Sequence, residues 1–171
     1  MPHTAPPRRL SLVAAMSENR VLGANGDMPW SLPDEMAQFR AFTLGHAVIM
    51  GHTTFEAGGG KPLPHRRNLV LTRQKTWTAP EGVEVFTNLD AALSAVQDDC
   101  EPFITGGAEI YHLALPHIDR MYLTTIHATL EGDTFFPDYD DAQWHLTDAR
   151  HHPADPRHAH ACTVRTLDRK R

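Results

Sequence analysis

Short apolar runs, rich in aliphatic and β-branched residues, recur along the chain. Runs of this length that lack a polar alternation indicate strands buried on both faces, as in a parallel sheet. Helix-like stretches lie between several of them, which predicts an α/β fold with helices on the faces of the sheet. We interpret the following runs as strands: Leu10–Met16, Ala47–Met50, Asn68–Thr72, Val83–Phe86, Phe103–Thr105 and Met121–His127.

The helices are indicated by apolar positions three and four residues apart and by capping residues. Pro33–Phe42 shows this spacing. Asn88 is a favourable N-cap residue for a helix at Ala91–Val96, and Ala108–Leu115 follows a pair of glycines. These stretches supply helices between the predicted strands.

The pattern changes after residue 120. Met121–His127, Trp144–His151 and Ala159–Leu167 are all strand-like, and no helix signal separates them. We therefore expect these three strands to form an antiparallel C-terminal edge on the same sheet. The predicted fold is a mostly parallel sheet of about eight strands flanked by about four helices.

Length and composition agree with a single globular unit. The chain has 171 residues, 41% hydrophobic and 22% charged, which suits one domain with one core. The first eight residues are rich in proline, so we expect residues 1–8 to be a loose tail and residues 9–171 to be the domain.

Charge and hydropathy exclude several classes of partner. The formal charge is −5, and the 16 Lys and Arg residues form no stripe, so we expect no nucleic-acid partner. No window approaches the roughly 20 apolar residues of a membrane span. The apolar run after Arg8-Arg9 is too short for an export signal. The two cysteines, Cys100 and Cys162, favour a reducing compartment and hence the cytoplasm, although sequence alone leaves one disulfide open.

Open α/β sheets bind ligands beyond the carboxyl ends of their strands, and three predicted strand ends here suit a phosphate. Gly106-Gly107 separates a strand from a helix, so backbone N–H groups could approach a pyrophosphate there; a simple tight turn explains the pair equally well. Gly51 to Thr54 follows a second strand, and Thr72-Arg73 offers a hydroxyl and a guanidinium after a third. Together these ends favour a dinucleotide.

Two familiar phosphate motifs are absent. Gly60-Lys61 lacks the Ser or Thr of a P-loop, and Pro62 would break the helix that must follow. No G-x-G-x-x-G occurs, so the dinucleotide fingerprint of the doubly wound fold is missing.

Glu35 lies beside the apolar face of the first predicted helix. On spacing alone it is a solvated charge in the first helical turn. The alternative is a carboxylate on an apolar face, which needs a hydrogen-bonding partner such as the amidine edge of a flat heterocycle.

The chain resembles the dihydrofolate reductase family in an ordered set of motifs that runs from about residue 9 to residue 168. The matching segments are Leu12–Ala15, Val21–Gly23, Met28–Met36, Val48–Glu56, Pro62–Asn68, Ile104–Tyr111, Tyr122–Thr124 and Gly132–Pro137. The resemblance implies a dihydrofolate-reductase-like fold and the NADPH-dependent reduction of 7,8-dihydrofolate to tetrahydrofolate in one-carbon metabolism.

The resemblance implies a pterin site centred on Glu35, which replaces the solvated interpretation of that residue. Glu35 would bind the 2-amino group and adjacent ring nitrogen and assist protonation, with Thr124 supporting it through a water. Arg66 would meet the α-carboxylate of the glutamate tail. The remaining substrate-binding residues implied are Val13, Ala14, Met36, Phe39, Thr54, Leu63 and Thr105.

The same resemblance implies an NADPH site along the strand ends. Ala15 would bind the nicotinamide carboxamide, Leu22 would contact the ring, and Thr72 and Arg73 would meet the 2′-phosphate. The other residues implied to contact the cofactor are Gly51, His52, Thr53, Thr54, Leu71, Gly106, Gly107, Ala108, Glu109 and Ile110.

The loop from Gly23 to Met28 is implied to be a lid over the reacting rings. We expect a water admitted under Met28 to deliver the proton, while Glu35 sets the electrostatics of the ring. Met28, Trp30, Glu35 and Thr124 therefore make up the expected catalytic group.

Some positions depart from the family pattern. His52 stands where many members have Arg, and Glu109 stands where some have a base, which places more of the preference for NADPH on Arg73. Gly58-Gly59 and the polar Thr105 change the substrate pocket, where antifolates would also bind.

Two alternative functions remain beside this interpretation. One is a riboflavin-pathway pyrimidine reductase of the same fold, and the other is a catalytically silent nucleotide-binding protein. We expect no metal at the histidines of 150–160, because no carboxylate or cysteine ligand spacing accompanies them. We expect the protein to be a monomer.

Overall fold

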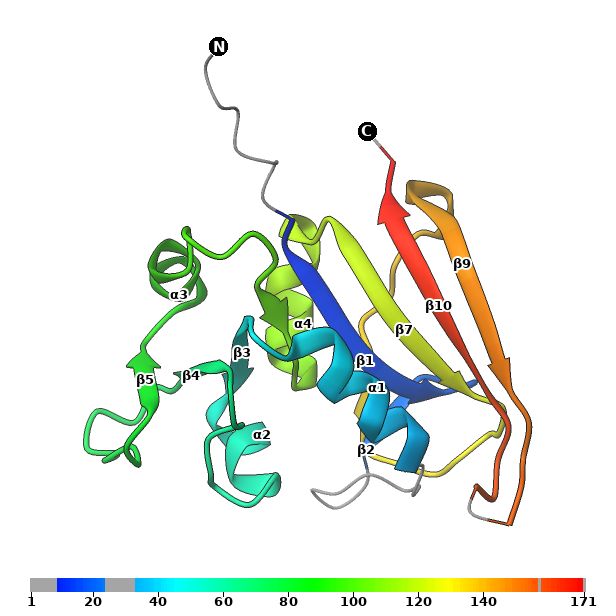
Figure 1. The fold of residues 1–171 in the computed structure, drawn as a ribbon, viewed down its shortest axis with the longest axis horizontal. Coiled ribbons are helices and arrows are strands. Elements are labelled where there is room, and N and C mark those ends of the chain that lie inside the picture. Colours follow the sequence, from blue (N-terminus) through cyan, green and yellow to red (C-terminus); the bar gives the residue numbers. More distant parts are fainter. Residues whose placement is uncertain (1–8, 24–32, 157, 171) are drawn as a thin grey trace.

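The computed structural model describes residues 9–23, 33–156 and 158–170, with the side chains of residues 23–36 outside the description (Figure 1). Its centre is an eight-stranded sheet in the order β5-β4-β3-β6-β1-β7-β10-β9. The strands of this sheet are β1 (Ser11–Ser17), β3 (Ala47–Gly51), β4 (Arg67–Leu71), β5 (Val83–Phe86), β6 (Phe103–Ile104), β7 (Arg120–Ile126), β9 (Trp144–His152) and β10 (Cys162–Arg169).

The helices fall between the strands much as the apolar spacing predicts. They are α1 (Pro33–Thr43), α2 (His52–Ala57), α3 (Leu89–Ala95) and α4 (Ala108–Ala114), with single 3₁₀ turns η1 (Leu115–His117) and η2 (Asp141–Gln143). The side chain of Asn88 accepts a hydrogen bond from the backbone N–H of Ala91, so the predicted N-cap of α3 is confirmed.

The predicted antiparallel C-terminal edge is confirmed, and it consists of β7, β10 and β9. β7 pairs in parallel with β1 over seven residue pairs, from Ser11 opposite Arg120 to Ser17 opposite Ile126. β10 is antiparallel to both β7 and β9. It is therefore the one strand of the eight that runs against the others, and it makes the C-terminal edge of the sheet antiparallel, as predicted.

Two short segments were not predicted as strands. β2 (Val21–Gly23) and β8 (Thr134–Phe135) form a separate two-stranded ribbon. They are too short to show a period. The last predicted strand also begins later than expected, at Cys162, because Asp155 and His158 close a turn through two backbone hydrogen bonds of 2.9 and 3.0 Å.

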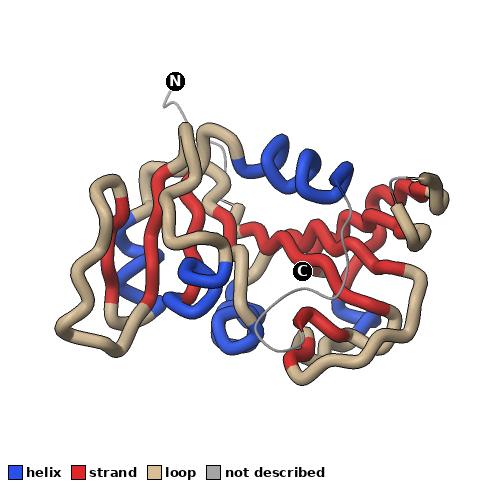
Figure 2. Tube along the Cα trace, turned by 90° about the horizontal axis from the view of Figure 1, so that it is seen from below, coloured by secondary structure: helices blue, strands red, loops and turns tan. Residues whose placement is uncertain are grey.

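The two faces of the sheet carry separate apolar layers, because side chains alternate along each strand. Figure 2 shows α1 lying along one face. On that side, Phe39 of α1 and Phe55 of α2 pack in one cluster with Val13, Val48 and Val70. The other face is covered by α3 and α4, whose apolar residues pack in a second cluster with Leu12, Ala14, Ile49, Leu69 and Ile104.

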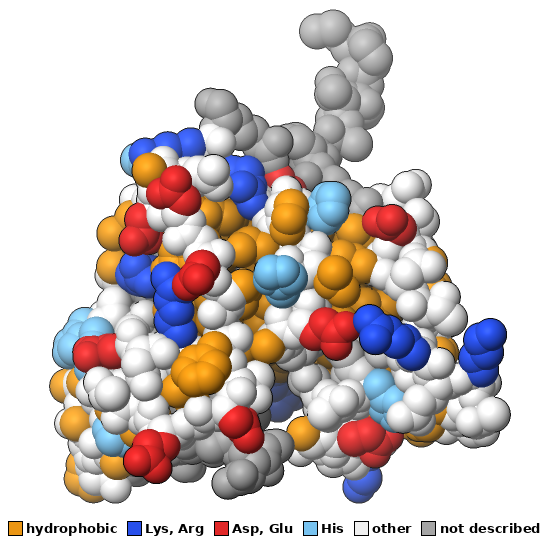
Figure 3. All heavy atoms as spheres, turned by 180° about the vertical axis from the view of Figure 1, so that it is seen from behind, with side chains coloured by type: hydrophobic (Ala, Val, Ile, Leu, Met, Phe, Trp, Pro, Cys, Tyr) orange, Lys and Arg blue, Asp and Glu red, His pale blue; other side chains and the backbone are white. Residues whose placement is uncertain are grey.

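The surface carries charges of both signs. On the face opposite that of Figure 1, acidic, basic and histidine side chains are interspersed with apolar ones (Figure 3). Within the described ranges, no helix is both long enough and apolar enough to cross a membrane. Both cysteines are free thiols, Cys100 exposed and Cys162 buried, so the disulfide that sequence alone left open is absent.

Candidate active site

The carboxyl ends of β3 and β6 are joined by backbone hydrogen bonds, and this junction is the centre of the candidate site. The N–H of Gly51 donates to the carbonyl of Gly106 at 2.8 Å, and the N–H of Thr105 donates to the carbonyl of Ile49 at 3.0 Å. The segments 51–54 and 105–110, which are far apart in the sequence, therefore lie side by side. The sequence predicted both segments as phosphate-binding, and the structure brings them together.

The glycine pair at this junction has little room for a side chain. Gly106 has φ +121°, where other residues are strained, and a Cβ there would lie 3.2 Å from the Tyr111 hydroxyl. A Cβ on Gly107 would lie 2.9 Å from Thr54 Oγ1. The peptide between the two glycines is cis. Because residues 106 and 107 carry no side chains, no side-chain atoms of their own cover the backbone at the start of α4.

The middle of the sheet forms the next wall of the site. The Tyr111 hydroxyl donates to the carbonyl of Val13 at 2.8 Å, which ties α4 to β1. Ala15 lies opposite Thr124 in the register of β1 and β7, and Thr124 is buried. Val13, Ala15 and Thr124, which the resemblance implied on separate grounds, thus lie on adjacent strands.

Thr72, directly after β4, places its hydroxyl beside the first residue of α2, His52. His52 Nδ1 lies 3.0 Å from the hydroxyl of Thr72, and the His52 ring lies against Trp77 with 4.2 Å between ring centroids. Its other nitrogen, Nε2, lies 3.3 Å from Glu56. His52 is thus held between a hydroxyl, a carboxylate and an aromatic ring.

Arg73 already has an acidic partner. Its Nη2 donates to Oε1 of Glu109 at 2.9 Å, and the two side chains are 88% and 68% exposed. Arg73, which was expected to meet the 2′-phosphate, and His52, which was expected in the cofactor cradle, therefore both contact a carboxylate. Sequence analysis placed Glu109 at the cofactor, where some family members have a base, but its contact with Arg73 could not be inferred.

Arg66 lies on the other side of the sheet, near the end of α1. Its Nη1 donates to the buried hydroxyl of Thr43 at 3.0 Å and its Nε donates to the carbonyl of Pro64 at 3.0 Å. Partial burial lowers the pKa of the Arg66 guanidinium, and the nearby charge of Arg40 lowers it further. A bound carboxylate would offset this repulsion.

The loop before β4 is organised by Asn68, which is buried. Its Oδ1 accepts from the N–H of Leu63 at 2.8 Å, and its Nδ2 donates to the carbonyls of Leu63 and Arg66 at 3.0 and 2.9 Å. Leu63 and Phe39 both pack against the cluster that contains Val13 and Met50. One side chain therefore fixes an apolar wall and the arginine beside it.

Part of the predicted site lies outside the described residues. Met28 and Trp30 fall in the undescribed range 24–32, and the side chains of Glu35 and Met36 are likewise outside the description, although both residues belong to the first turn of α1. Leu22 lies in β2 and packs against the second cluster. The other predicted positions lie in the described residues, on strands β1, β3, β4 and β7, in helices α1, α2 and α4, or in the loops beside them.

Sequence reasoning missed four residues that shape the site: Thr43, Asn68, Trp77 and Tyr111. Asn68 is a polar side chain beside the apolar run Leu69 to Leu71, which is a usable signal for a structural hydrogen bond, whereas Thr43 ends a helix of mixed polarity and carries no such signal. Tyr111 follows the glycine pair by four residues, one helical turn. The position of Trp77 beside His52 has no sequence signal, because a loop connects it.

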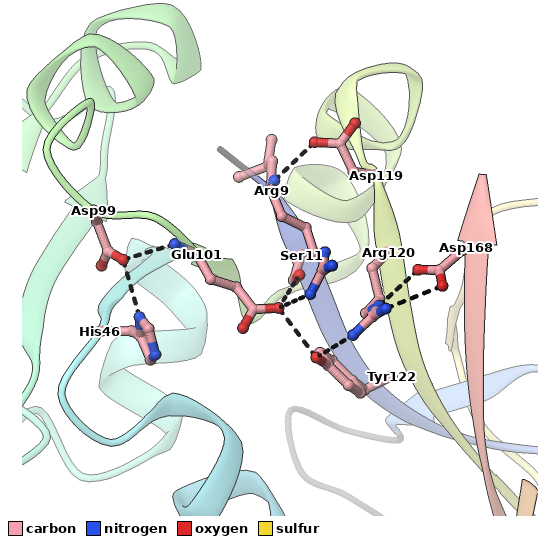
Figure 4. A network of polar contacts seen from close by, with 10 residues as sticks. Arg9, Ser11, His46, Asp99, Glu101, Asp119, Arg120, Tyr122 and Asp168 are labelled. Carbon is pink, nitrogen blue, oxygen red and sulfur yellow. Dashed lines mark hydrogen bonds and ion pairs between the residues drawn. The ribbon is translucent and has the colours of Figure 1, made fainter. Parts of the chain in front are cut away.

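The described groups with shifted pKa values lie mainly at the opposite edge of the sheet (Figure 4). Glu101 accepts from Ser11 and from Tyr122 at 2.8 and 3.0 Å, and Arg120 donates twice to Asp168 at 2.6 and 3.0 Å. The bond from Arg120 lowers the pKa of Asp168, and burial raises that of Tyr122. Since Ser11 and Arg120 begin their strands, this network joins the amino ends, away from the glycine pair.

Asp99 belongs to the same edge. Burial alone would raise the pKa of its carboxyl, but hydrogen bonds from His46 and from the backbone N–H groups of Ala47 and Glu101 outweigh burial and lower the pKa. These bonds clamp the loop before β6 to the start of β3. The shifted groups at this edge connect strands.

Comparisons with known proteins agree on one family. A sequence model described as dihydrofolate reductase matches residues 9–169. Dihydrofolate reductase type 3 of Salmonella typhimurium is 48% identical over 95% of this chain and 99% of its own length. Dihydrofolate reductase of Bacillus subtilis is 40% identical over 80% of each chain. The structure of Enterococcus faecalis dihydrofolate reductase complexed with NADP(H) and RAB-propyl superposes with a TM-score of 0.89 at 33% identity, covering 95% of this chain and 97% of that one.

Proposed function

The chain belongs to the dihydrofolate reductase family, and we propose that it reduces 7,8-dihydrofolate with NADPH at the carboxyl edge of its sheet, in the site built around Gly106 and Gly107. The observation that carries the location is the junction of β3 and β6, where Gly51 donates to Gly106 at 2.8 Å. It brings together the two segments that suit the cofactor's phosphates.

The residues at this junction fit an NADP cofactor. A Cβ on Gly107 would lie 2.9 Å from Thr54 Oγ1, so glycine keeps this part of the backbone free of side-chain atoms, and its polar groups can face a pyrophosphate. Thr72, His52 and Arg73 supply a hydroxyl, an imidazole and a guanidinium for the 2′-phosphate. When bound, the cofactor supplies the hydride.

The pterin is bound between β1, α1 and β7 in this proposal. The Val13 carbonyl, held by the Tyr111 hydroxyl at 2.8 Å, faces the pterin edge with Ala14 and the carbonyl of Thr105. By its place in the family motif, Glu35 would bind the 2-amino group of the pterin. Because Tyr111 bridges β1 and the glycine helix, it sets the position of the pterin wall relative to the cofactor cradle.

The chain's main contribution to hydride transfer is alignment. The two ring faces must approach to about 3–3.5 Å, and a rigid sheet can fix such a distance better than a loop. Ala15 and Thr124, opposite each other in β1 and β7, lie where the two rings meet. Thr124 supports Glu35 through a water, and a water admitted beside Met28 protonates the ring nitrogen.

Arg66 holds the substrate's glutamate tail. Its guanidinium is oriented by Thr43 and by the Pro64 carbonyl, and a planar fork binds an α-carboxylate through two parallel hydrogen bonds. Phe39 and Leu63, which pack on the same cluster, form the apolar wall between the pterin and this tail. Antifolates that mimic the pterin bind in the same place.

The direct test is NADPH oxidation followed with and without dihydrofolate. We expect oxidation only when dihydrofolate is present. Oxidation with a ribosylated pyrimidine but not with dihydrofolate would instead identify the riboflavin-pathway reductase. Binding of NADPH without turnover of either substrate would identify a silent nucleotide-binding protein.

Glu35→Gln tests the assignment of the carboxylate. We expect a strong loss of turnover at neutral pH and partial recovery in acid, because the amide cannot assist protonation whereas free protons can. Asp34→Asn is the matched control, since it changes the neighbouring acid by the same chemistry. An unchanged rate and pH profile in Glu35→Gln would contradict the assignment.

A further inference from the structure

Three potential metal ligands meet at the turn that joins β9 to β10, away from the glycine pair. His152 is the last residue of β9, and Asp155 and His158 close the turn that follows. One ring nitrogen of each histidine and one carboxylate oxygen of Asp155 all lie within 4.8 Å of one another. Asp155 therefore supplies the carboxylate that the sequence pattern of this histidine-rich segment did not reveal.

The spacing of these atoms suits a small divalent ion. His158 Nδ1 lies 2.8 Å from Asp155 Oδ1, and His152 Nε2 lies 4.0 Å from Asp155 Oδ2. Tetrahedral zinc with bonds of about 2.0–2.1 Å needs ligand atoms about 3.3–3.4 Å apart. The two distances lie on either side of that value and run to different oxygens of Asp155, so the carboxylate must turn for a single ion to contact all three side chains.

The ligands are held in place by their surroundings. The His152 Nδ1 atom lies 2.8 Å from the carbonyl of Pro153, which favours the tautomer with Nε2 as the ligand atom. His158 is only 2% exposed, and its ring lies 4.5 Å from that of His152 between centroids. The backbone bonds between Asp155 and His158 fix the turn itself.

We propose that His152, Asp155 and His158 form a binding site for a divalent transition-metal ion of the zinc class, separate from the reductase site. Two imidazole nitrogens and one carboxylate oxygen are a donor set that zinc accepts, with water completing the shell. The ion would join the end of β9 to the turn before β10. It would stabilise this hairpin and take no part in the reduction.

A second group, His46, Asp99 and Cys100, also has ligand atoms within 4.8 Å of one another. Its carboxylate, however, already accepts from His46 and from the backbone N–H groups of Ala47 and Glu101. A metal there would have to break the clamp between these loops. We use this second group as a control for the proposed site.

The test is zinc titration of the whole chain against a chromophoric chelator, with the thermal midpoint measured in parallel. We expect one zinc ion per chain and a higher midpoint with zinc, since an ion that binds only the folded state stabilises it. His152→Ala should weaken zinc binding at least about tenfold, because even partners behind the ligands cost that much. The same variant should lose the midpoint shift and keep the rate of NADPH oxidation.

Two matched variants separate this site from other histidines. His145→Ala removes an exposed histidine from the same strand, and His46→Ala removes the ligand of the second group; both should keep the zinc stoichiometry and the midpoint shift. The proposal is overturned if wild type binds no zinc, if His152→Ala binds it unchanged, or if His46→Ala alone abolishes binding. Circular dichroism checks that each variant is folded.

Discussion

Glu109→Gln should improve the binding of NADPH without improving that of NADH. In the structure Glu109 accepts a hydrogen bond from Arg73 at 2.9 Å, and Arg73 is the guanidinium proposed for the 2′-phosphate. The phosphate must therefore displace the carboxylate or bind beside it. NADH has no 2′-phosphate, so its binding neither displaces the Glu109 carboxylate nor places a second negative charge beside it.

The magnitude follows from the exposure of the pair. The Arg73 and Glu109 side chains are 88% and 68% exposed, and such pairs contribute about 0.2–1 kcal/mol. A phosphate on the far side of the guanidinium would lie about 7 Å from the carboxylate, where repulsion after screening is about 0.5 kcal/mol. The total is about 1 kcal/mol, or about fivefold in the KM for NADPH.

The assay compares KM for NADPH and NADH at saturating dihydrofolate, at low and at high salt. We expect the NADPH value to fall about fivefold at low salt and less at high salt, with the NADH value unchanged. Glu131→Gln, which makes the same charge change in the loop after β7, is the control. An equal improvement for both cofactors, or none for NADPH, would refute the reasoning.

Three further predictions follow from the site and the sheet. Gly107→Ala should raise the Kd for NADPH at least about tenfold in a fluorescence titration, because the new Cβ lies 2.9 Å from Thr54 Oγ1 and crowds the cradle; equal affinity would contradict this. Asn68→Ala should lower the free energy of unfolding by about 1–3 kcal/mol and raise the KM for dihydrofolate more than it lowers kcat, whereas the exposed control Asn88→Ala should spare KM. For Asp99, the lowered folded pKa adds stability above the unfolded value near 3.9, and this is lost as pH falls through the folded pKa. Asp99→Asn should therefore be less stable than wild type at pH 7 in urea unfolding and nearly equal in strong acid; a constant difference would oppose this linkage.

Much of the fold could be predicted because local pattern and tertiary environment agree. The strand Ala47–Gly51 reads as an unbroken apolar run because it is buried in the middle of the sheet, and the cap at Asn88 is a local hydrogen bond. Strand direction carries no such local signal. The sequence predicted the antiparallel C-terminal edge, but the parallel pairing of β7 with β1 is set by the sheet as a whole and could not be inferred.

In the candidate site, too, features carried by neighbouring residues could be predicted, whereas contacts between distant residues could not. The glycine pair and the Thr72-Arg73 segment were identified because their chemistry is carried by neighbouring residues. The partners of those residues come from elsewhere in the chain: Glu109 reaches Arg73 across 36 positions, and Tyr111 reaches Val13 across 98. Only a folded structure can supply such pairs.

The strand order has a consequence for the growing chain on the ribosome. β1 begins at Ser11, yet its neighbours β6 and β7 lie between Phe103 and Ile126, and β9 joins the sheet only through β10. The first apolar strand, β1, therefore has no partner strand until about a hundred further residues have been synthesised. At ordinary translation rates this synthesis takes about 5–20 seconds. During that interval Leu12 to Met16 are exposed to chaperones and to other nascent chains, and slow synthesis of the middle of the chain lengthens the exposure.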